Sequence, residues 1–224
     1  MCRFLMIKSK KPAQIMSILG DFAQMCKENI EWQGDGWGVA WKEEGAAQRA
    51  LPGGWKIEKS LKPIWEDINR FNDIPASTLT IIHARGASFP SQKGDIGYNQ
   101  PYADDNLCFV FNGELYGVSI NAEGKIGAQK IFSLVKKNLD KDNPKQTLTK
   151  IQDLLIKNSK GILGLNIGYV LNNAFFISCY FGDDSKKDYY TVRYFKDGSQ
   201  TIVCSEKISN YPWRSMEKGE IIGL

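Results

Sequence analysis

Two kinds of hydrophobic pattern alternate along this chain of 224 residues. Short apolar runs, often rich in β-branched residues, predict strands, whereas apolar residues spaced three and four apart predict helices. Runs of the first kind cover residues 3–7, 36–41, 78–84, 107–111, 163–171, 174–181, 189–195 and 201–204. Runs of the second kind cover residues 12–28, 61–71, 127–137 and 148–157.

The predicted strands come in groups, with helices between the groups. Short turn sequences separate the last four strands, namely Asn172-Asn173, Gly182-Asp183-Asp184 and Lys196-Asp197-Gly198, and such spacing indicates antiparallel meanders. Stacked sheets with helices on the outside would bury this much apolar strand. We therefore predict an α+β fold. Because no repeat, low-complexity tract or interior boundary is visible, we predict one domain over residues 1–224.

Composition narrows the functional classes. Hydrophobic residues make up 42% and charged residues 24%, and the net charge of +4 is scattered, which does not favour nucleic-acid binding. No apolar run approaches a membrane span and no signal peptide is apparent, so we expect a cytoplasmic protein. Five widely spaced cysteines without a CxxC pair, and one histidine, lead us to expect no disulfide framework, no metal and no cofactor.

Polar or glycine-rich clusters lie at the ends of three predicted strands. They are Asp35-Gly36-Trp37-Gly38, His83-Ala84-Arg85-Gly86-Ala87-Ser88 and Asn112-Gly113-Glu114-Leu115. Each has a plain structural interpretation as well. Asn-Gly is a common hairpin turn, an arginine at a strand end is usually a surface charge, and the glycines beside Trp37 could serve close packing.

A cysteine occupies position 2. Removal of residue 1 would place a thiol and an α-amine on the same residue, and an α-amine with a reference pKa near ~8 is a suitable base. The alternative is that Cys2 is an ordinary small buried residue. The choice depends on what the rest of the chain builds around it.

Taken together, these segments resemble the class II glutamine amidotransferases of the N-terminal nucleophile hydrolase superfamily. The segments that carry the resemblance occur in that family's order, namely Met1-Cys2, Asp35-Gly36-Trp37-Gly38-Val39-Ala40, His83-Ala84-Arg85-Gly86-Ala87-Ser88, Asn99-Gln100-Pro101-Tyr102 and Phe111-Asn112-Gly113-Glu114-Leu115. The match is clearest over residues 1–117, and stand-alone members of about this length look most similar. The resemblance implies a four-layer αββα sandwich of two stacked antiparallel sheets.

The resemblance also implies catalytic roles. Cys2 would be the nucleophile, activated by its own α-amine. The side-chain amide of Asn112 and the backbone N–H of Gly113 would form the oxyanion hole. Arg85 would bind the α-carboxylate of glutamine through a two-point contact.

Further positions are implied to surround the substrate. Gly86, Ala87 and Ser88 would line the pocket, Gly36 and Trp37 would pack beside the nucleophile, and Asn99 would brace the loop over the site. His83 is interpreted as a structural hydrogen-bonding residue and not as a general base.

One position departs from the family pattern. Family members usually carry an aspartate, which pairs with the α-ammonium of glutamine, where this chain has Ala128. Gln129 could accept a hydrogen bond there, and Glu123 or Asp104 could supply a charge from a loop. The resemblance therefore implies a substrate that is either glutamine or another γ-glutamyl compound.

Several hypotheses follow. The first is a glutaminase-type amidohydrolase or amidotransferase, acting alone or with a synthase subunit as ammonia acceptor. The second is a non-catalytic ligand-binding or regulatory module on the same fold, since the missing acid would weaken substrate binding. A basic RNA-associated domain is a third, less favoured because the six tryptophans lie in apolar segments. Edge-like strands near the C-terminal end could support a homodimer.

Overall fold

The computed structural model describes residues 1–42, 54–104 and 107–224. These residues form two antiparallel sheets. Sheet A contains, in spatial order, β11 (Arg214–Ser215), β9 (Arg193–Lys196), β10 (Gln200–Cys204), β1 (Arg3–Ala13), β4 (Ser77–Ala84), β2 (Trp37–Lys42) and β3 (Trp55–Ser60). Sheet B contains β12 (Ile221–Gly223), β8 (Ala174–Ser178), β7 (Gly161–Leu171), β6 (Leu107–Tyr116) and β5 (Tyr102–Asp104).

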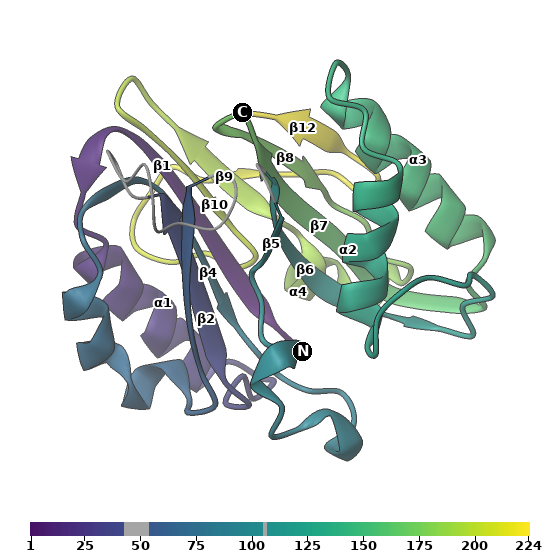
Figure 1. Cartoon of the computed structure of the whole chain (residues 1–224), viewed down its shortest axis with the longest axis horizontal. Coiled ribbons are helices and arrows are strands. Elements are labelled where there is room, and N and C mark those ends of the chain that lie inside the picture. The colour runs from purple at the N-terminus through teal and green to yellow at the C-terminus, as the bar shows by residue number, and fades with distance from the viewer. Residues whose placement is uncertain (43–53, 105–106) are drawn as a thin grey trace.

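Helices cover the outer faces of the two stacked sheets (Figure 1). Helix α1 (Met16–Glu28) lies on sheet A, and its buried side includes Leu19 and Phe22. Helices α2 (Gly127–Lys137) and α3 (Pro144–Lys157) lie on sheet B. The order of layers is therefore helix, sheet, sheet, helix, which confirms the predicted four-layer αββα sandwich.

The alternation of side chains along the strands explains the three hydrophobic cores. Phe4 and Met6 of β1 face Cys108 and Val110 of β6 in the core between the sheets. The intervening residues face outward, so Leu5 packs in the core under α1, while the alternate residues of β6 pack under α2 and α3. The first half of β1 and the first half of β6 are thus buried on both faces, which is why residues 3–7 and 107–111 form nearly continuous apolar runs.

Several element boundaries differ from the sequence prediction. Strand β1 continues to Ala13, so the first helix begins at Met16 and not at residue 12. Residues 61–71 form no α-helix but fold into two 3-10 helices, η1 (Ile64–Glu66) and η2 (Ile68–Asp73). The run 189–195 divides into α4 (Lys187–Tyr190) and β9. The other 3-10 helices of the described residues are η3 (Pro90–Gln92), η4 (Ile96–Tyr98) and η5 (Asp184–Lys186).

The turn interpretation of Asn112-Gly113 is wrong. Strand β6 continues through both residues to Tyr116, and Asn112 pairs with Asn166 and Gly113 with Leu165 of β7. The hairpin turn prediction holds instead at Asn172 and Asn173, which both adopt positive φ between β7 and β8.

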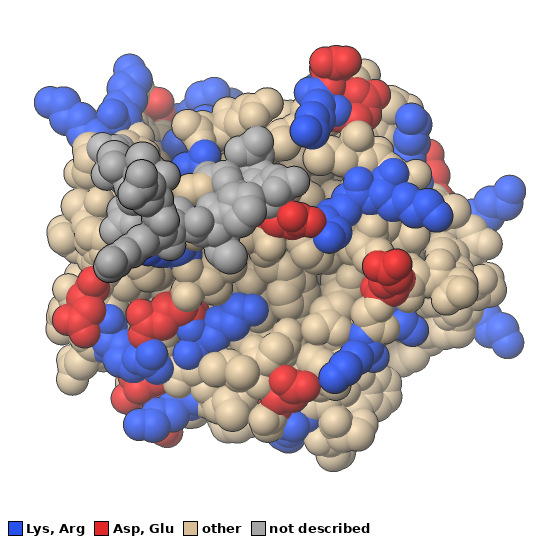
Figure 2. All heavy atoms as spheres, viewed as in Figure 1, with Lys and Arg blue, Asp and Glu red and all other residues tan. Residues whose placement is uncertain are grey.

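The surface gives two further observations. Figure 2 shows basic and acidic side chains interspersed over the face in view, without a continuous basic stripe. Among the helices of the described residues, none has the length and apolar character needed to cross a membrane.

Candidate active site

Three strand ends of sheet A meet at the site. Arg3 of β1 and Trp37 of β2 both pair with Ala84 of β4, so the residues just beyond these pairs are neighbours. The backbone N–H of Arg85 donates to the Gly36 carbonyl at 2.8 Å. The Cys2 thiol donates to the Gly86 carbonyl at 3.6 Å. The antiparallel register thus brings together the first and second sequence clusters and Cys2.

The third cluster reaches the site from sheet B. Asn112 has the same parity on β6 as Cys108 and Val110, and Cys2 has the same parity as Phe4 and Met6 on β1. Both side chains are therefore directed to the space between the sheets. Asn112 is fully buried, and neither its amide nitrogen nor its amide oxygen has a hydrogen-bond partner. A buried amide without a partner is costly, which indicates a ligand-binding role.

Gly113 permits the close approach of two strands. A Cβ at this position would collide with the carbonyl oxygen of Gly164 on β7. Only glycine therefore keeps the Gly113 backbone in register beside the cavity.

Arg85 is 3% exposed and has an unsatisfied donor. Its Nη2 donates to the Gln92 carbonyl at 2.6 Å, and its guanidinium lies 5.8 Å from the centre of the Tyr98 ring. Its buried Nη1 has no partner. The guanidinium is thus held in place by the protein with one donor left for an anionic group.

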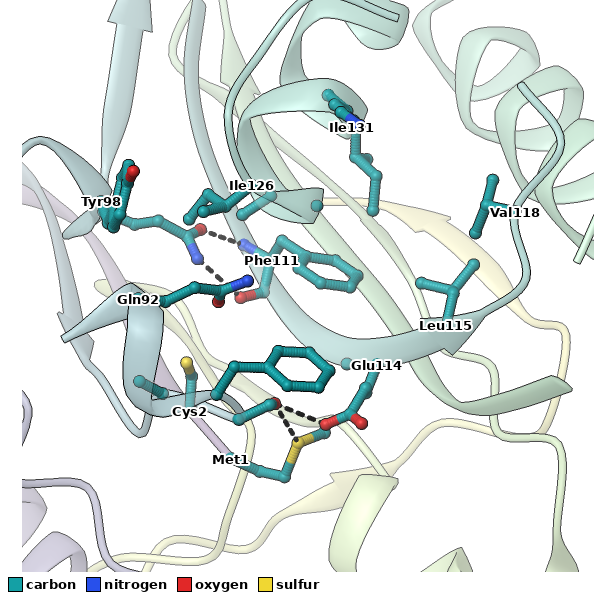
Figure 3. A pocket seen from close by; sticks show the side chains of 18 of the residues that line it. Met1, Cys2, Gln92, Tyr98, Phe111, Glu114, Leu115, Val118, Ile126 and Ile131 are labelled. Atoms are coloured by element: carbon teal, nitrogen blue, oxygen red, sulfur yellow. Dashed lines mark hydrogen bonds between the residues drawn. The ribbon is translucent and has the colours of Figure 1, made fainter. Parts of the chain in front are cut away.

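A cavity of about 220 Å³ lies beside these groups (Figure 3). Six of the predicted site residues line this cavity, namely Cys2, Arg85, Gly86, Ala87, Ser88 and Gly113. In Figure 3, Cys2 and Gln92 lie on one side of Phe111, and Ile131, Leu115 and Val118 lie on the other. The cavity therefore has a polar end at sheet A and an apolar end toward α2.

The electrostatic environment of Cys2 has opposing parts. Burial raises the pKa of the Cys2 thiol, while the α-ammonium of Met1, the hydrogen bond with Gly86 and the charge of Arg85 act in the opposite direction. Met1 also lines the cavity, and its α-ammonium pairs with Glu31 at 2.8 Å. With residue 1 in place, the α-ammonium belongs to Met1 and is paired with the Glu31 carboxylate.

His83 is a neutral structural residue. It is fully buried, and burial together with the nearby Arg85 guanidinium lowers its pKa to about 3, although the Phe111 backbone opposes the shift. An imidazole with this pKa does not exchange protons near neutral pH. This agrees with the interpretation of His83 as a group other than the general base, but neither ring nitrogen has a hydrogen-bond partner, so the hydrogen-bonding role expected of it is not observed.

Five of the residues expected at the site do not line the cavity, namely Gly36, Trp37, Asn99, Asn112 and Gln129. Asn99 braces a loop, as expected, whereas the placement of Trp37 and Gln129 beside the substrate is wrong. Trp37 faces the core under α1, where its ring packs 4.5 Å from that of Phe71. Asn99 is buried and donates to the Ser60 carbonyl at 2.7 Å. Gln129 accepts from the Lys125 backbone at 2.9 Å and donates to the Gly97 carbonyl at 3.3 Å. These contacts brace the loops, and none of the three residues lines the cavity.

The acids considered as replacements for the missing aspartate are also elsewhere. Asp104 pairs with Lys136 at 2.7 Å, and Glu123 is exposed; neither lines the cavity. The carboxylate that does line it is Glu114, which accepts a hydrogen bond from Ser88. Its place directly after Asn112-Gly113 is a signal that the sequence offered. Within the described residues, no group of three metal-ligating side chains is placed to hold an ion.

Comparison with known proteins agrees with this architecture. No protein-family model and no curated protein matches the chain in sequence. Among solved structures, a glutamine aminotransferase class-II domain protein from Silicibacter pomeroyi is similar with a TM-score of 0.66 and 14% identity, over 99% of this chain and 94% of the other. A predicted glutamine amidotransferase from Pseudomonas aeruginosa is similar with a TM-score of 0.59 and 14% identity, over 99% and 96%.

This chain has the fold of the class II glutamine amidotransferases. Glutamine phosphoribosylpyrophosphate (PRPP) amidotransferase from B. subtilis also matches, with a TM-score of 0.63 and 15% identity, over 99% of this chain but 47% of that one. The chain therefore corresponds to about half of that enzyme. The resemblance that the motifs predicted is confirmed at the level of the fold.

Proposed function

We propose that this protein hydrolyses the side-chain amide of glutamine or of a related γ-glutamyl compound, with Cys2 as the nucleophile. One observation carries the proposal. A thiol, a buried guanidinium with an unpaired Nη1 and the backbone of Gly113 come from three separate segments and line one cavity, and next to Gly113 the buried Asn112 amide has no hydrogen-bond partner. Its fold, shared with solved glutamine amidotransferases, supports the same chemistry.

The proposed reaction has two steps. The Cys2 sulfur attacks the amide carbon, an S–C bond forms, the C–N bond breaks, and ammonia leaves with the proton of the thiol. Water then adds to the thioester, the S–C bond breaks, and the product leaves as a carboxylate. Asn112 and Gly113 donate to the oxygen that becomes negative in both steps, and Arg85 binds the substrate carboxylate.

The proposal requires that the peptide bond between Met1 and Cys2 be cut. The α-amine would then belong to Cys2 and could take the thiol proton, whereas the α-ammonium of Met1 is paired with Glu31. The added positive charge on the same residue also favours the thiolate, against the burial that raises the pKa of the thiol. The mass of the purified protein reports whether the cut has occurred.

Labelling with an electrophilic glutamine analogue, followed by peptide mass mapping, tests the nucleophile. The other four cysteines, Cys26, Cys108, Cys179 and Cys204, are buried, so a label restricted to the N-terminal peptide is expected. Ammonia release from a panel of carboxylate-bearing primary amides should be lost in Cys2→Ala. Unchanged turnover in that variant would disprove the proposal.

A non-catalytic binding module is the second candidate, favoured by the position of Met1 against the cavity and its ion pair with Glu31. In that case the purified protein retains residue 1, binds carboxylate-bearing amides in calorimetry and releases no ammonia. Glu31→Gln distinguishes the two candidates further, because it removes the partner of the Met1 ammonium and should not affect a protein already cut before Cys2.

A further inference from the structure

The apolar end of the cavity lies between sheet B and its covering helices. Beyond Phe111 of β6, most of the lining residues have apolar side chains, which come from the end of β6, from the β6–α2 connection, from α2 and from α3. They are Leu115, Val118, Ile120, Ala122, Ile126, Ala128, Ile131, Leu134 and Leu155. The cavity thus enters the hydrophobic core that α2 and α3 form with sheet B.

The charges around the cavity disfavour a substrate ammonium group. Among the described residues that line it, Glu114 is the one acid, and its carboxylate already accepts a hydrogen bond from Ser88. Arg85 and Lys130 contribute two positive charges to the lining. Helix α2 begins at Gly127 without a side-chain cap, so the positive end of its dipole adds to them. A substrate ammonium group bound here would lose its hydration without gaining a carboxylate partner that is free of other hydrogen bonds, and this costs binding free energy.

The same wall suits an amide carbonyl followed by a hydrocarbon chain. A carbonyl oxygen near Gly127 and Ala128 would supply the acceptor that an N-cap normally provides. Carbon atoms beyond it would contact Ile126, Ile131 and Leu155, which are 8%, 3% and 2% exposed. A cavity with a few polar groups at one end and apolar walls at the other is typical of a small-molecule site.

We propose that the substrate is a glutamine whose α-amino nitrogen carries an acyl group, with the acyl chain lying between β6 and helices α2 and α3. This inference rests on the proposed function, because Arg85 and Cys2 fix the carboxylate and the side-chain amide at the polar end. The third substituent of the α-carbon is then left to the apolar end. Cys2 forms a bond with the side-chain amide carbon, ammonia leaves, and water releases the N-acylglutamate; the acyl bond stays intact.

The test measures kcat/KM for ammonia release by the full chain cut before Cys2. The substrates are L-glutamine and its N-acetyl, N-butanoyl, N-hexanoyl and N-octanoyl derivatives. γ-Glutamylhexylamide is a further substrate, and its turnover is measured as release of hexylamine. We expect L-glutamine to be the poorest of the glutamines, with kcat/KM rising about fourfold per buried methylene until the cavity is filled. L-Glutamine equal to or better than the acylated series overturns the inference.

Two other outcomes overturn it as well. Preference for γ-glutamylhexylamide would place the apolar group on the leaving amine. Release of free glutamine from the N-acyl substrates would mean that the acyl bond is the one cleaved. The first result would leave hydrolysis of the side-chain amide by Cys2 standing. The second would contradict the proposed function as well, as would no turnover of any substrate together with no analogue label on Cys2.

A matched pair of variants tests the position of the acyl group. Ala128→Asp adds a carboxylate at the start of α2, and Ala128→Asn adds a neutral group of the same size. We expect Ala128→Asp to raise kcat/KM for L-glutamine about tenfold and to lower that for N-octanoylglutamine by a similar factor, since one buried charge contact is worth about that much. Ala128→Asn should not improve L-glutamine. Equal effects of the two variants on both substrates would contradict the inference.

Binding gives a readout that does not depend on turnover. In the Cys2→Ala variant, calorimetry should show tighter binding of N-octanoylglutamine than of N-acetylglutamine or L-glutamine. Glu114→Gln should leave this order unchanged. If L-glutamine binds best and loses affinity in Glu114→Gln, then Glu114 holds an ammonium and the inference is wrong.

Discussion

The two ends of the cavity are built by different means. At the polar end, Cys2 and Arg85 lie at neighbouring strand ends of sheet A, where backbone pairing fixes their positions. At the apolar end, residues such as Ile131 and Leu155 are placed only by the packing of α2 and α3 on sheet B. Strand register thus sets the proposed chemistry, while helix packing sets which molecule can reach it. Four predictions, ordered by expected effect, test that division.

The largest effect is expected at Asn112. Asn112→Ala should lower kcat about a hundredfold to a thousandfold with little change in KM, because one donor to the oxyanion is lost. Stability should not fall, since the Asn112 amide has no partner to leave unpaired. Steady-state kinetics and urea unfolding measure the two quantities.

Asn166 is the matched control for Asn112. It lies opposite Asn112 on β7, but its amide donates to the Tyr190 carbonyl at 2.6 Å and accepts from the Tyr180 backbone at 3.0 Å. Asn166→Ala should therefore cost about 1–3 kcal/mol of stability and change kcat far less. Equal losses of kcat in both variants would contradict a specific role for Asn112.

Arg85→Lys should raise KM about tenfold to hundredfold with a smaller effect on kcat. A lysine cannot donate to the Gln92 carbonyl and to a substrate carboxylate in the geometry of a guanidinium, and a charged hydrogen bond is worth about 1.5–3 kcal/mol. Arg70→Lys is the control, because Arg70 pairs with Glu58 and Asp67 away from the cavity. An unchanged KM in Arg85→Lys would show that the carboxylate binds elsewhere.

His83 should make stability depend on pH. Its folded pKa of about 3 lies below the ordinary value of 6.5, so the unfolded chain takes up a proton that the folded protein does not. The free energy of unfolding should therefore fall as pH drops from 6.5 toward 3, by up to about 1.4 kcal/mol per pH unit. Urea unfolding at several pH values should show a shallower dependence in His83→Asn, and identical slopes would refute the assignment.

The smallest effects are expected at polar residues that the sequence suggested as substrate contacts but that do not line the cavity. Gln129→Ala and Asp104→Asn should each leave KM within about twofold, because neither side chain lines the cavity. Asp104→Asn should also cost at most about 1 kcal/mol of stability, as expected for its exposed pair with Lys136. A large rise in KM in either variant would mean that substrate recognition extends to the outer side of α2.

Local pattern predicted much of this fold. The apolar run at 163–171 and the turn at Asn172-Asn173 appear as expected, and the periodicity over residues 127–137 matches α2. The helix predicted over residues 61–71 failed, since Pro63 and the packing of Ile64 and Phe71 under α1 favour two short 3-10 helices. Asn112-Gly113 was ambiguous because the same dipeptide suits a turn or a strand that must approach a neighbour closely.

The sequence by itself determined the α+β class and a set of polar residues at strand ends, because strand periodicity and glycine positions are local properties. The order of the motifs also led to the hypothesis that Cys2, Arg85 and Asn112 share one active site. Only the tertiary structure decided that Trp37, Asn99 and Gln129 lie outside the cavity and that Glu114 lies inside it. The apolar end of the cavity could not be predicted from the sequence either. Ile131 and Leu155 come together with Phe111 only when two helices pack on a sheet, and local sequence patterns do not specify that packing.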